Sequence, residues 1–170
     1  IRKIQLDPVR RKIYILSIDM AFINGKIISY DLDGIAAPLT LSDSSPKRDM
    51  TLDHVNGYLY YTTTIAGEGI KRFNLNTSLI EGFYNINIAG TSYVTPDYKG
   101  SVYYIEGALI YGVDGGGVPF SLGLVPAPSN PQGLCYDGTT DFIYYYDTGV
   151  IRKVDVDAPT VSILVKTTGD

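Results

Sequence analysis

The chain has 170 residues, of which 45% are hydrophobic and 19% charged, and its formal net charge is −4. This balance excludes a disordered chain, and scattered Lys and Arg without a basic stripe argue against a nucleic-acid-binding surface. No run of 18 apolar residues occurs, so we expect no membrane-spanning helix.

A short tyrosine-containing motif recurs four times. Its shared tyrosines are 46, 43 and 41 residues apart, and they are Tyr14, Tyr60, Tyr103 and Tyr144. A period of 40 to 45 residues, with several short β-type runs in each unit, is typical of propeller blades. The spacing predicts an all-β protein, a β-propeller of four four-stranded antiparallel blades.

In chain order, each repeat contains four candidate strands bounded by turn residues. The first repeat gives 1–7, 12–18, 26–32 and 38–41. The second gives 50–53, 58–63, 69–75 and 83–88. The third gives 92–95, 101–105, 108–113 and 118–122. The fourth gives 133–136, 141–146, 150–156 and 160–166. We therefore expect one propeller domain over 1–170, with repeats of about 1–49, 50–90, 91–130 and 131–170.

Acidic residues recur at fixed offsets. Asp7, Asp53 and Asp137 stand seven residues before a shared tyrosine, and the third repeat has Pro96 there with Asp97 next. Asp or Asn also closes each third strand. Because these residues stabilise turns through their own backbone, we expect structural roles for them. Calcium binding is the alternative, and it requires the acidic residues to line the axis.

In three of the four repeats a second tyrosine follows the shared one, and it has two interpretations. Alternate strand residues face opposite sides of a sheet, and a blade is covered on both sides, so Tyr61, Tyr104 and Tyr145 are expected in the core. Alternatively, these tyrosines lie at blade edges and bind a sugar or a partner protein. The single cysteine, Cys135, excludes an internal disulfide and is expected to be a small buried hydrophobe.

The segments Leu6-Asp7-Pro8 and Tyr30-Asp31-Leu32-Asp33-Gly34, around the aromatic strand at Tyr14, carry a family resemblance. They resemble the YWTD β-propellers of low-density-lipoprotein-receptor-type ectodomains and nidogen. The signature is degenerate: its Trp is absent, and only the fourth copy keeps the final Asp, at Asp147, for which we expect a structural role. Thr95-Pro96-Asp97 before the third aromatic strand is similar to TolB-type propellers.

The resemblance implies six blades, whereas this chain supplies four. Four blades can close as a small ring, or they form an arc completed by other chains or by missing sequence. An unclosed arc exposes two apolar blade faces, so we expect self-association or further sequence to be at least as favourable as a closed monomer.

The resemblance further implies an extracellular, secreted, non-enzymatic module that presents propeller faces to protein partners. The sequon Asn76-Thr77-Ser78 suits N-glycosylation on such a protein. One alternative is a metal-dependent propeller hydrolase of the lactonase kind, for which Glu106 and His54 are the candidate catalytic residues. The other is a lectin-like propeller that binds glycans through Tyr61, Tyr104 and Tyr145. We expect no catalytic residue, metal or cofactor in the favoured interpretation.

Overall fold

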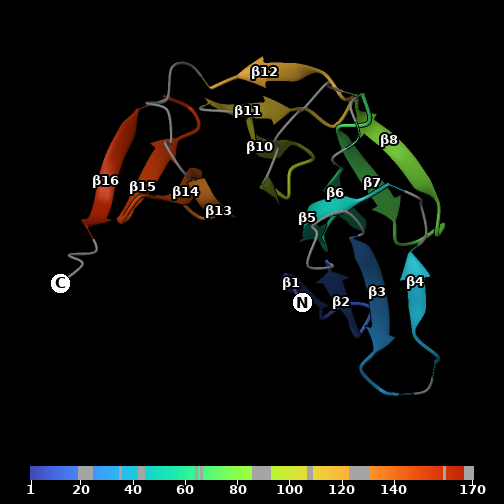
Figure 1. The fold of residues 1–170 in the computed structure, drawn as a ribbon. Coiled ribbons are helices and arrows are strands. Elements are labelled where there is room, and N and C mark those ends of the chain that lie inside the picture. Colours follow the sequence, from blue (N-terminus) through green and yellow to red (C-terminus); the bar gives the residue numbers. More distant parts are fainter. Residues whose placement is uncertain are drawn as a thin grey trace. The chain divides into compact units, whose positions relative to one another are not determined.

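The computed structural model describes residues 1–18, 25–34, 36–41, 45–63, 65, 67–85, 93–106, 109–122, 131–158 and 160–166. These residues form sixteen strands and no helix (Figure 1). The strands pair antiparallel into four sheets of four consecutive strands each. The predicted fold class, an all-β propeller of four four-stranded blades, is confirmed.

Each blade uses its strands in chain order, so the first strand and the fourth form the two edges. Blade 1 consists of β1 (Lys3–Asp7), β2 (Lys12–Ser17), β3 (Lys26–Asp31) and β4 (Leu39–Leu41). Blade 2 consists of β5 (Lys47–Asp53), β6 (Tyr58–Thr63), β7 (Ile70–Asn74) and β8 (Ile80–Tyr84). Blade 3 consists of β9 (Val94–Pro96), β10 (Val102–Glu106), β11 (Leu109–Val113) and β12 (Pro119–Ser121). Blade 4 consists of β13 (Pro131–Asp137), β14 (Phe142–Asp147), β15 (Val150–Asp155) and β16 (Val161–Lys166).

Several strand ends differ from the prediction: β8 begins at Ile80, three residues before its predicted start, and two other strands begin early where a bulge adds pairs. β5 begins three residues early because the pairing with β6 continues past a register shift between Lys47 and Asp49. β13 begins at Pro131 for the same reason, with a shift between Gln132 and Leu134. An extra residue in one strand lets the ladder continue after a local irregularity, which a strict alternation pattern does not reveal. Residues 86–88, 92 and 108, which were predicted in strands, lie outside the described residues.

The chain divides into two compact units, Ile1–Thr91 and Ser92–Asp170. Unit 1 contains blades 1 and 2, and unit 2 contains blades 3 and 4. Each unit is described by itself below. The expectation of a single domain over 1–170 and the repeat boundaries stay predictions.

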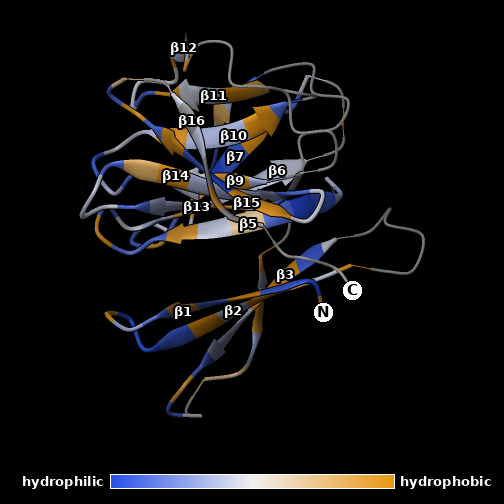
Figure 2. Ribbon diagram, turned by 90° about the vertical axis from the view of Figure 1, so that its left-hand side faces the viewer, coloured by the Kyte–Doolittle hydropathy of each residue, from blue (hydrophilic) through white to orange (hydrophobic). Residues whose placement is uncertain are grey.

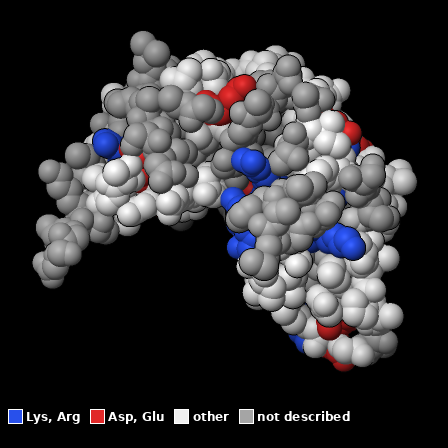
Figure 3. Space-filling view, viewed as in Figure 1, with Lys and Arg blue, Asp and Glu red and all other residues white. Residues whose placement is uncertain are grey.

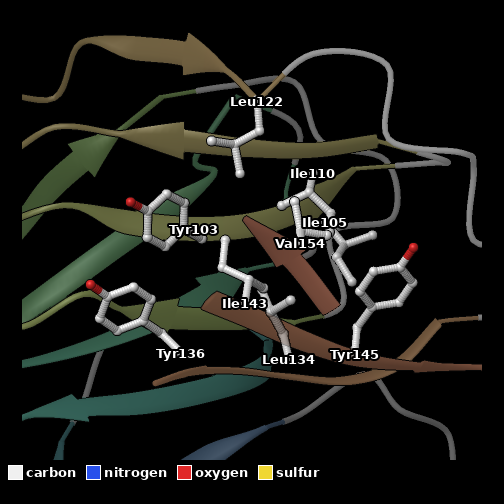
Figure 4. Packing of buried hydrophobic residues seen from close by; sticks show 9 residues of the cluster. All are labelled: Tyr103, Ile105, Ile110, Leu122, Leu134, Tyr136, Ile143, Tyr145 and Val154. Atoms are coloured by element: carbon white, nitrogen blue, oxygen red, sulfur yellow. The ribbon is translucent and has the colours of Figure 1, made fainter. Parts of the chain in front are cut away.

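Each unit has one apolar core between its two blades. In unit 1 the core residues of blade 1 are Tyr14, Leu16, Ile27 and Leu41, and those of blade 2 are Met50, Leu52, Leu59, Tyr61 and Phe73. In unit 2 (Figure 4) blade 3 contributes Tyr103, Ile105, Ile110 and Leu122, and blade 4 contributes Leu134, Tyr136, Ile143, Tyr145 and Val154. The strands alternate between apolar and polar segments (Figure 2), as burial of alternate residues requires.

The two cores use equivalent residues. When the repeats are aligned on their shared tyrosines, Tyr103 is equivalent to Tyr14. The strand pairing within each blade then makes Ile110 equivalent to Ile27. The same alignment places Tyr145 on Tyr61 and Val154 on Phe73. In both units, therefore, the shared-tyrosine face of one blade packs on the opposite face of the next blade.

Candidate functional site

An aspartate at the end of each first strand organises the turn to the second strand; it is the last strand residue in blades 1, 2 and 4 and follows β9 directly in blade 3. Asp53 is fully buried, and its Oδ1 accepts hydrogen bonds from the backbone N–H groups of Val55 and Asn56 at 3.1 and 2.9 Å. Asp7 Oδ1 likewise accepts hydrogen bonds from the backbone N–H groups of Val9 and Arg10. In blade 3, where the strand is shorter, Asp97 accepts from Lys99 and Ser101 instead.

Blade 4 shows a more exposed version of this turn. Asp137 accepts from the backbone and hydroxyl of Thr139 and from the hydroxyl of Thr140. These hydrogen bonds favour the ionised carboxylate and hold the pKa of Asp137 below its usual range. Asp147, at the end of β14, accepts from the Thr148 hydroxyl and lies 3.6 Å from Arg152 Nε.

The shared tyrosines lie close enough to these aspartates for their charges to interact. Burial, reinforced by the charge of Asp7, raises the pKa of Tyr14 to about 12. Burial and the charge of Asp53 raise the pKa of Tyr60 to about 12 as well. The neutral phenol is the form that both effects favour, so neither tyrosine is set up as a base.

The second tyrosines lie inside the blades. Tyr61 and Tyr104 are 1% exposed and Tyr145 is 2% exposed. Tyr61 and Tyr145 belong to the two cores, while Tyr104 stacks on Tyr111 at 5.5 Å between ring centroids. A sugar needs an open aromatic face to stack on, and these three rings offer almost none.

The candidate catalytic residues lie in different units. His54 belongs to the turn after β5 in unit 1, and Glu106 is half-buried at the end of β10 in unit 2. Among the described residues, no group of three or more His, Cys, Asp or Glu side chains could hold a metal ion.

Asn76 is exposed in the turn between β7 and β8. Its Oδ1 accepts a hydrogen bond of 2.7 Å from Arg10, and Arg10 also pairs with Asp7. A glycan attaches to Nδ2, whereas this hydrogen bond uses Oδ1. The bond from Arg10 is therefore compatible with modification.

A basic surface lies at the end of unit 1 where the first and third strands of its blades begin. Strands one and three of an antiparallel sheet run in the same direction, so their first residues share one edge. The basic residues at this end are Arg2, Lys3, Lys26, Lys47, Arg48 and Lys71. We call this set the basic end; Figure 3 shows Lys and Arg side chains gathered around β5.

Contacts hold the inner part of the basic end together. Lys3 Nζ lies 3.0 Å from the buried Asp49 carboxylate, which joins the starts of β1 and β5. Lys71 pairs with Glu68 at 3.0 Å and donates to the Ser45 hydroxyl, and that hydroxyl also bonds Glu68. Lys47, 2% exposed, donates to the Ser45 carbonyl. Asp49 and Glu68 are the two carboxylates of this end in the described part of unit 1.

Sequence reasoning missed the basic end because it treated Lys and Arg as scattered. The signal was present: in the first two repeats, basic residues stand at the starts of the first and third strands. It becomes visible only when residues are grouped by strand direction and not by distance along the chain.

The burial expected for Cys135 is wrong, because this side chain is exposed. It pairs with Tyr144, on the face of blade 4 that is turned away from blade 3 within unit 2. A hollow of about 320 Å³ opens beside it. The lining residues are Gln132, Gly133, Leu134, Cys135, Tyr144, Tyr145, Tyr146 and Ile151.

Solved structures share the fold. The chain is similar to a chain in a nidogen/laminin complex, with a TM-score of 0.75 and 16% identity over 96% of this chain and 64% of that one. It is also similar to an auxiliary nutrient-binding protein from Bacteroides thetaiotaomicron VPI-5482, with a TM-score of 0.71 and 9% identity over 99% and 43% of the two chains. A third similar structure is the extracellular domain of a putative one-component system from B. thetaiotaomicron, with a TM-score of 0.65 and 15% identity over 96% and 25%.

At these identities the likeness shows the fold alone. The propeller architecture expected from the repeats is supported, while the YWTD resemblance and the TolB similarity stay predictions. The chain spans less than two thirds of the length of these structures. No protein-family model matches it, and no curated protein matches it.

In the part of the chain that the structure describes, no helix has the length and apolar character that a membrane span requires.

Proposed function

We propose that the chain is a non-enzymatic, extracellular protein-interaction module whose basic end binds an acidic segment of a partner protein. The observation that carries this proposal is the clustering of six basic residues at one end of unit 1 in a chain of net charge −4. Lys47 is buried, and the other five are exposed or half-buried. Two structural neighbours support the setting, one from a nidogen/laminin complex and one named as an extracellular domain.

The arrangement suits recognition of acidic groups. Asp49 and Glu68 pair with Lys3 and Lys71 and so fix the inner cations, while Arg2 and Lys26 are exposed at the same end. Exposed ion pairs contribute about 0–1 kcal/mol each, so several must act together. Such surfaces mainly accelerate association and favour partners of opposite charge, and salt weakens both effects.

The test is fluorescence anisotropy with a labelled peptide rich in Glu and Asp, titrated with the whole chain at low and high salt. We expect binding that weakens as salt rises. The double variant Lys26→Glu with Arg48→Glu should weaken it roughly ten-fold or more, since it reverses two charges at the basic end.

Lys26→Glu alone has a matched control in Lys12→Glu, which makes the same single charge reversal at the other end of blade 1. Lys12→Glu should leave the affinity within about two-fold of the parent. Equal effects of the two changes, or binding that ignores salt, would contradict the proposal.

The hydrolase and lectin alternatives have less support. The tyrosines of the lectin hypothesis are buried in the described structure. No observation favours either over the interaction module.

A further inference from the structure

Four blade faces have no partner blade within their own unit, one on each blade. Those of blades 2 and 3 contain Tyr60 and Tyr104, each 1% exposed, whereas those of blades 1 and 4 leave residues of core type exposed or half-buried. We call the latter two the Ile15 face of blade 1 and the Tyr144 face of blade 4. The Ile15 face consists of Ile4, Leu6, Ile13, Ile15, Ile28 and Tyr30, which form two rows of cross-strand neighbours. The Tyr144 face includes Cys135, Phe142, Tyr144, Tyr146 and Ile151.

The Ile15 face is equivalent to a face that is buried in blade 2. The repeat alignment places Ile4 on Met50 and Leu6 on Leu52. Met50 and Leu52 are 0% and 4% exposed in the core of unit 1, whereas Ile4 and Leu6 are 57% and 56% exposed. Isolated exposed apolar residues are ordinary, but two complete rows on one sheet face indicate an interaction surface.

The Tyr144 face is equivalent to the other half of the same interface. Tyr144, Tyr146 and Ile151 align with Tyr14, Leu16 and Ile27, the core residues that blade 1 packs on blade 2. In blade 4 these three residues are only half-buried, and they line the hollow of about 320 Å³. The hollow therefore lies where the side chains of a following blade belong.

We propose that the Ile15 face of one copy of this chain packs on the Tyr144 face of a second copy, head to tail. The pairing repeats an interface that the structure contains twice, once in each unit. In unit 2, Tyr103 stacks on Tyr136 at 5.8 Å between ring centroids, and in both units the first strands of neighbouring blades are in contact. By equivalence, Tyr144 of one copy lies against Leu6 of the other, and β13 lies against β1.

A head-to-tail interface either closes into a ring or extends into a filament. Two copies that each use both faces leave neither face uncovered, so we expect the closed assembly to contain two chains. This inference goes beyond the acidic partner and does not depend on the basic end.

The test is the molar mass of the purified chain by light scattering, followed through dilution. We expect twice the single-chain mass of 18.6 kDa, with dissociation on dilution. Leu6→Asp on the Ile15 face and Tyr144→Asp on the Tyr144 face should each raise the dissociation constant by roughly ten-fold or more. The control Leu79→Asp changes an equally exposed leucine, 61% exposed in the β7–β8 turn, and should change nothing.

Mixing the two variants identifies the geometry. The Leu6→Asp copy keeps its Tyr144 face and the Tyr144→Asp copy keeps its Ile15 face, so a mixture should regain the two-chain mass through one intact interface. Packing of two Ile15 faces on each other would instead leave Tyr144→Asp alone as a dimer, and that result would overturn the proposal.

Cys135 provides an independent readout, because it is exposed on the Tyr144 face. Its alkylation by a maleimide should slow as the protein concentration rises, and Leu6→Asp should abolish this protection. A folded chain that keeps the single-chain mass up to about 100 μM, well above a micromolar dissociation constant, would also overturn the proposal. Salt-dependent binding of the acidic peptide would be unaffected by that outcome, so the two proposals fail separately.

Discussion

The carboxylate at the end of each first strand accepts the hydrogen bonds that hold the following turn. Asp53 offers acceptors to two backbone N–H groups and to the side-chain amide of Asn56, and it is fully buried. Donors left without an acceptor in such a place cost about 1–3 kcal/mol. A residue of this kind is conspicuous in the sequence for structural reasons and can be mistaken for a catalytic acid or a metal ligand.

We predict that Asp53→Ala lowers the free energy of unfolding by about 1–3 kcal/mol in urea denaturation, because it leaves buried N–H donors without an acceptor. Asp53→Asn keeps one acceptor oxygen and should lose less. Asp137→Ala is the comparison at the equivalent, more exposed turn, where water can replace the carboxylate. A loss at Asp137 as large as that at Asp53 would contradict this account.

The shared tyrosines predict an alkaline limit to stability. Folding raises the pKa of Tyr14 and Tyr60 from 10.0 to about 12. The folded state therefore holds protons that the unfolded state has released, and stability falls as the pH rises above 10. Tyr14→Phe should make the free energy of unfolding less dependent on pH between about 10 and 12, as measured by urea denaturation; an unchanged slope would refute this reasoning.

At the scale of elements, the contact between blades in unit 1 includes a close approach of backbone. A Cβ atom added at Gly25, just before β3, would lie 2.1 Å from the carbonyl oxygen of Lys47 in β5. The backbone of a strand cannot rotate away as a side chain can. Gly25 is thus required by the spacing between the two sheets.

We predict that Gly25→Ala destabilises the protein by about 2–3 kcal/mol, since the strands must move apart to relieve the overlap. Gly112→Ala is the matched control: its Cβ would meet the ring of Phe120, which is partly exposed and can rotate. That change should cost about 1 kcal/mol, mainly the edge-to-face contact of Phe120 with Tyr103. Thermal unfolding of both variants shows which one loses more stability. A larger loss for Gly112→Ala than for Gly25→Ala would contradict this account.

Sequence patterns predicted the strands and their closing turns but not the irregularities within the sheets. The sixteen strands were predicted from alternation and turn residues, and the Asp or Asn ending each third strand does accept from the backbone of the following turn. The bulges near Lys47 and Gln132 were not predicted, because an extra residue in a ladder leaves no mark on the alternation of the partner strand.

At the scale of the whole molecule, an extracellular protein would pass through a secretory pathway. Expressed in secreting eukaryotic cells, the chain should gain a glycan on the exposed Asn76, detected by mass spectrometry and removed by an N-glycosidase. Ser78→Ala should abolish the modification, since the sequon requires the hydroxyl at that position, while Thr77→Ala should retain it. A secreted chain with unmodified Asn76 would contradict this prediction.

The sequence by itself determined the number of repeats, their four-strand composition and the turns that punctuate them. These follow from local periodicity and from residue types with strong backbone preferences, such as Asp and Gly. Tertiary structure decided that basic residues from four strand starts lie at one end of unit 1 and that Cys135 is exposed, and it selected the core over the blade edge for Tyr61 and Tyr145. Each of these depends on which sheet face or edge meets a neighbour, and that is a relation between segments far apart along the chain.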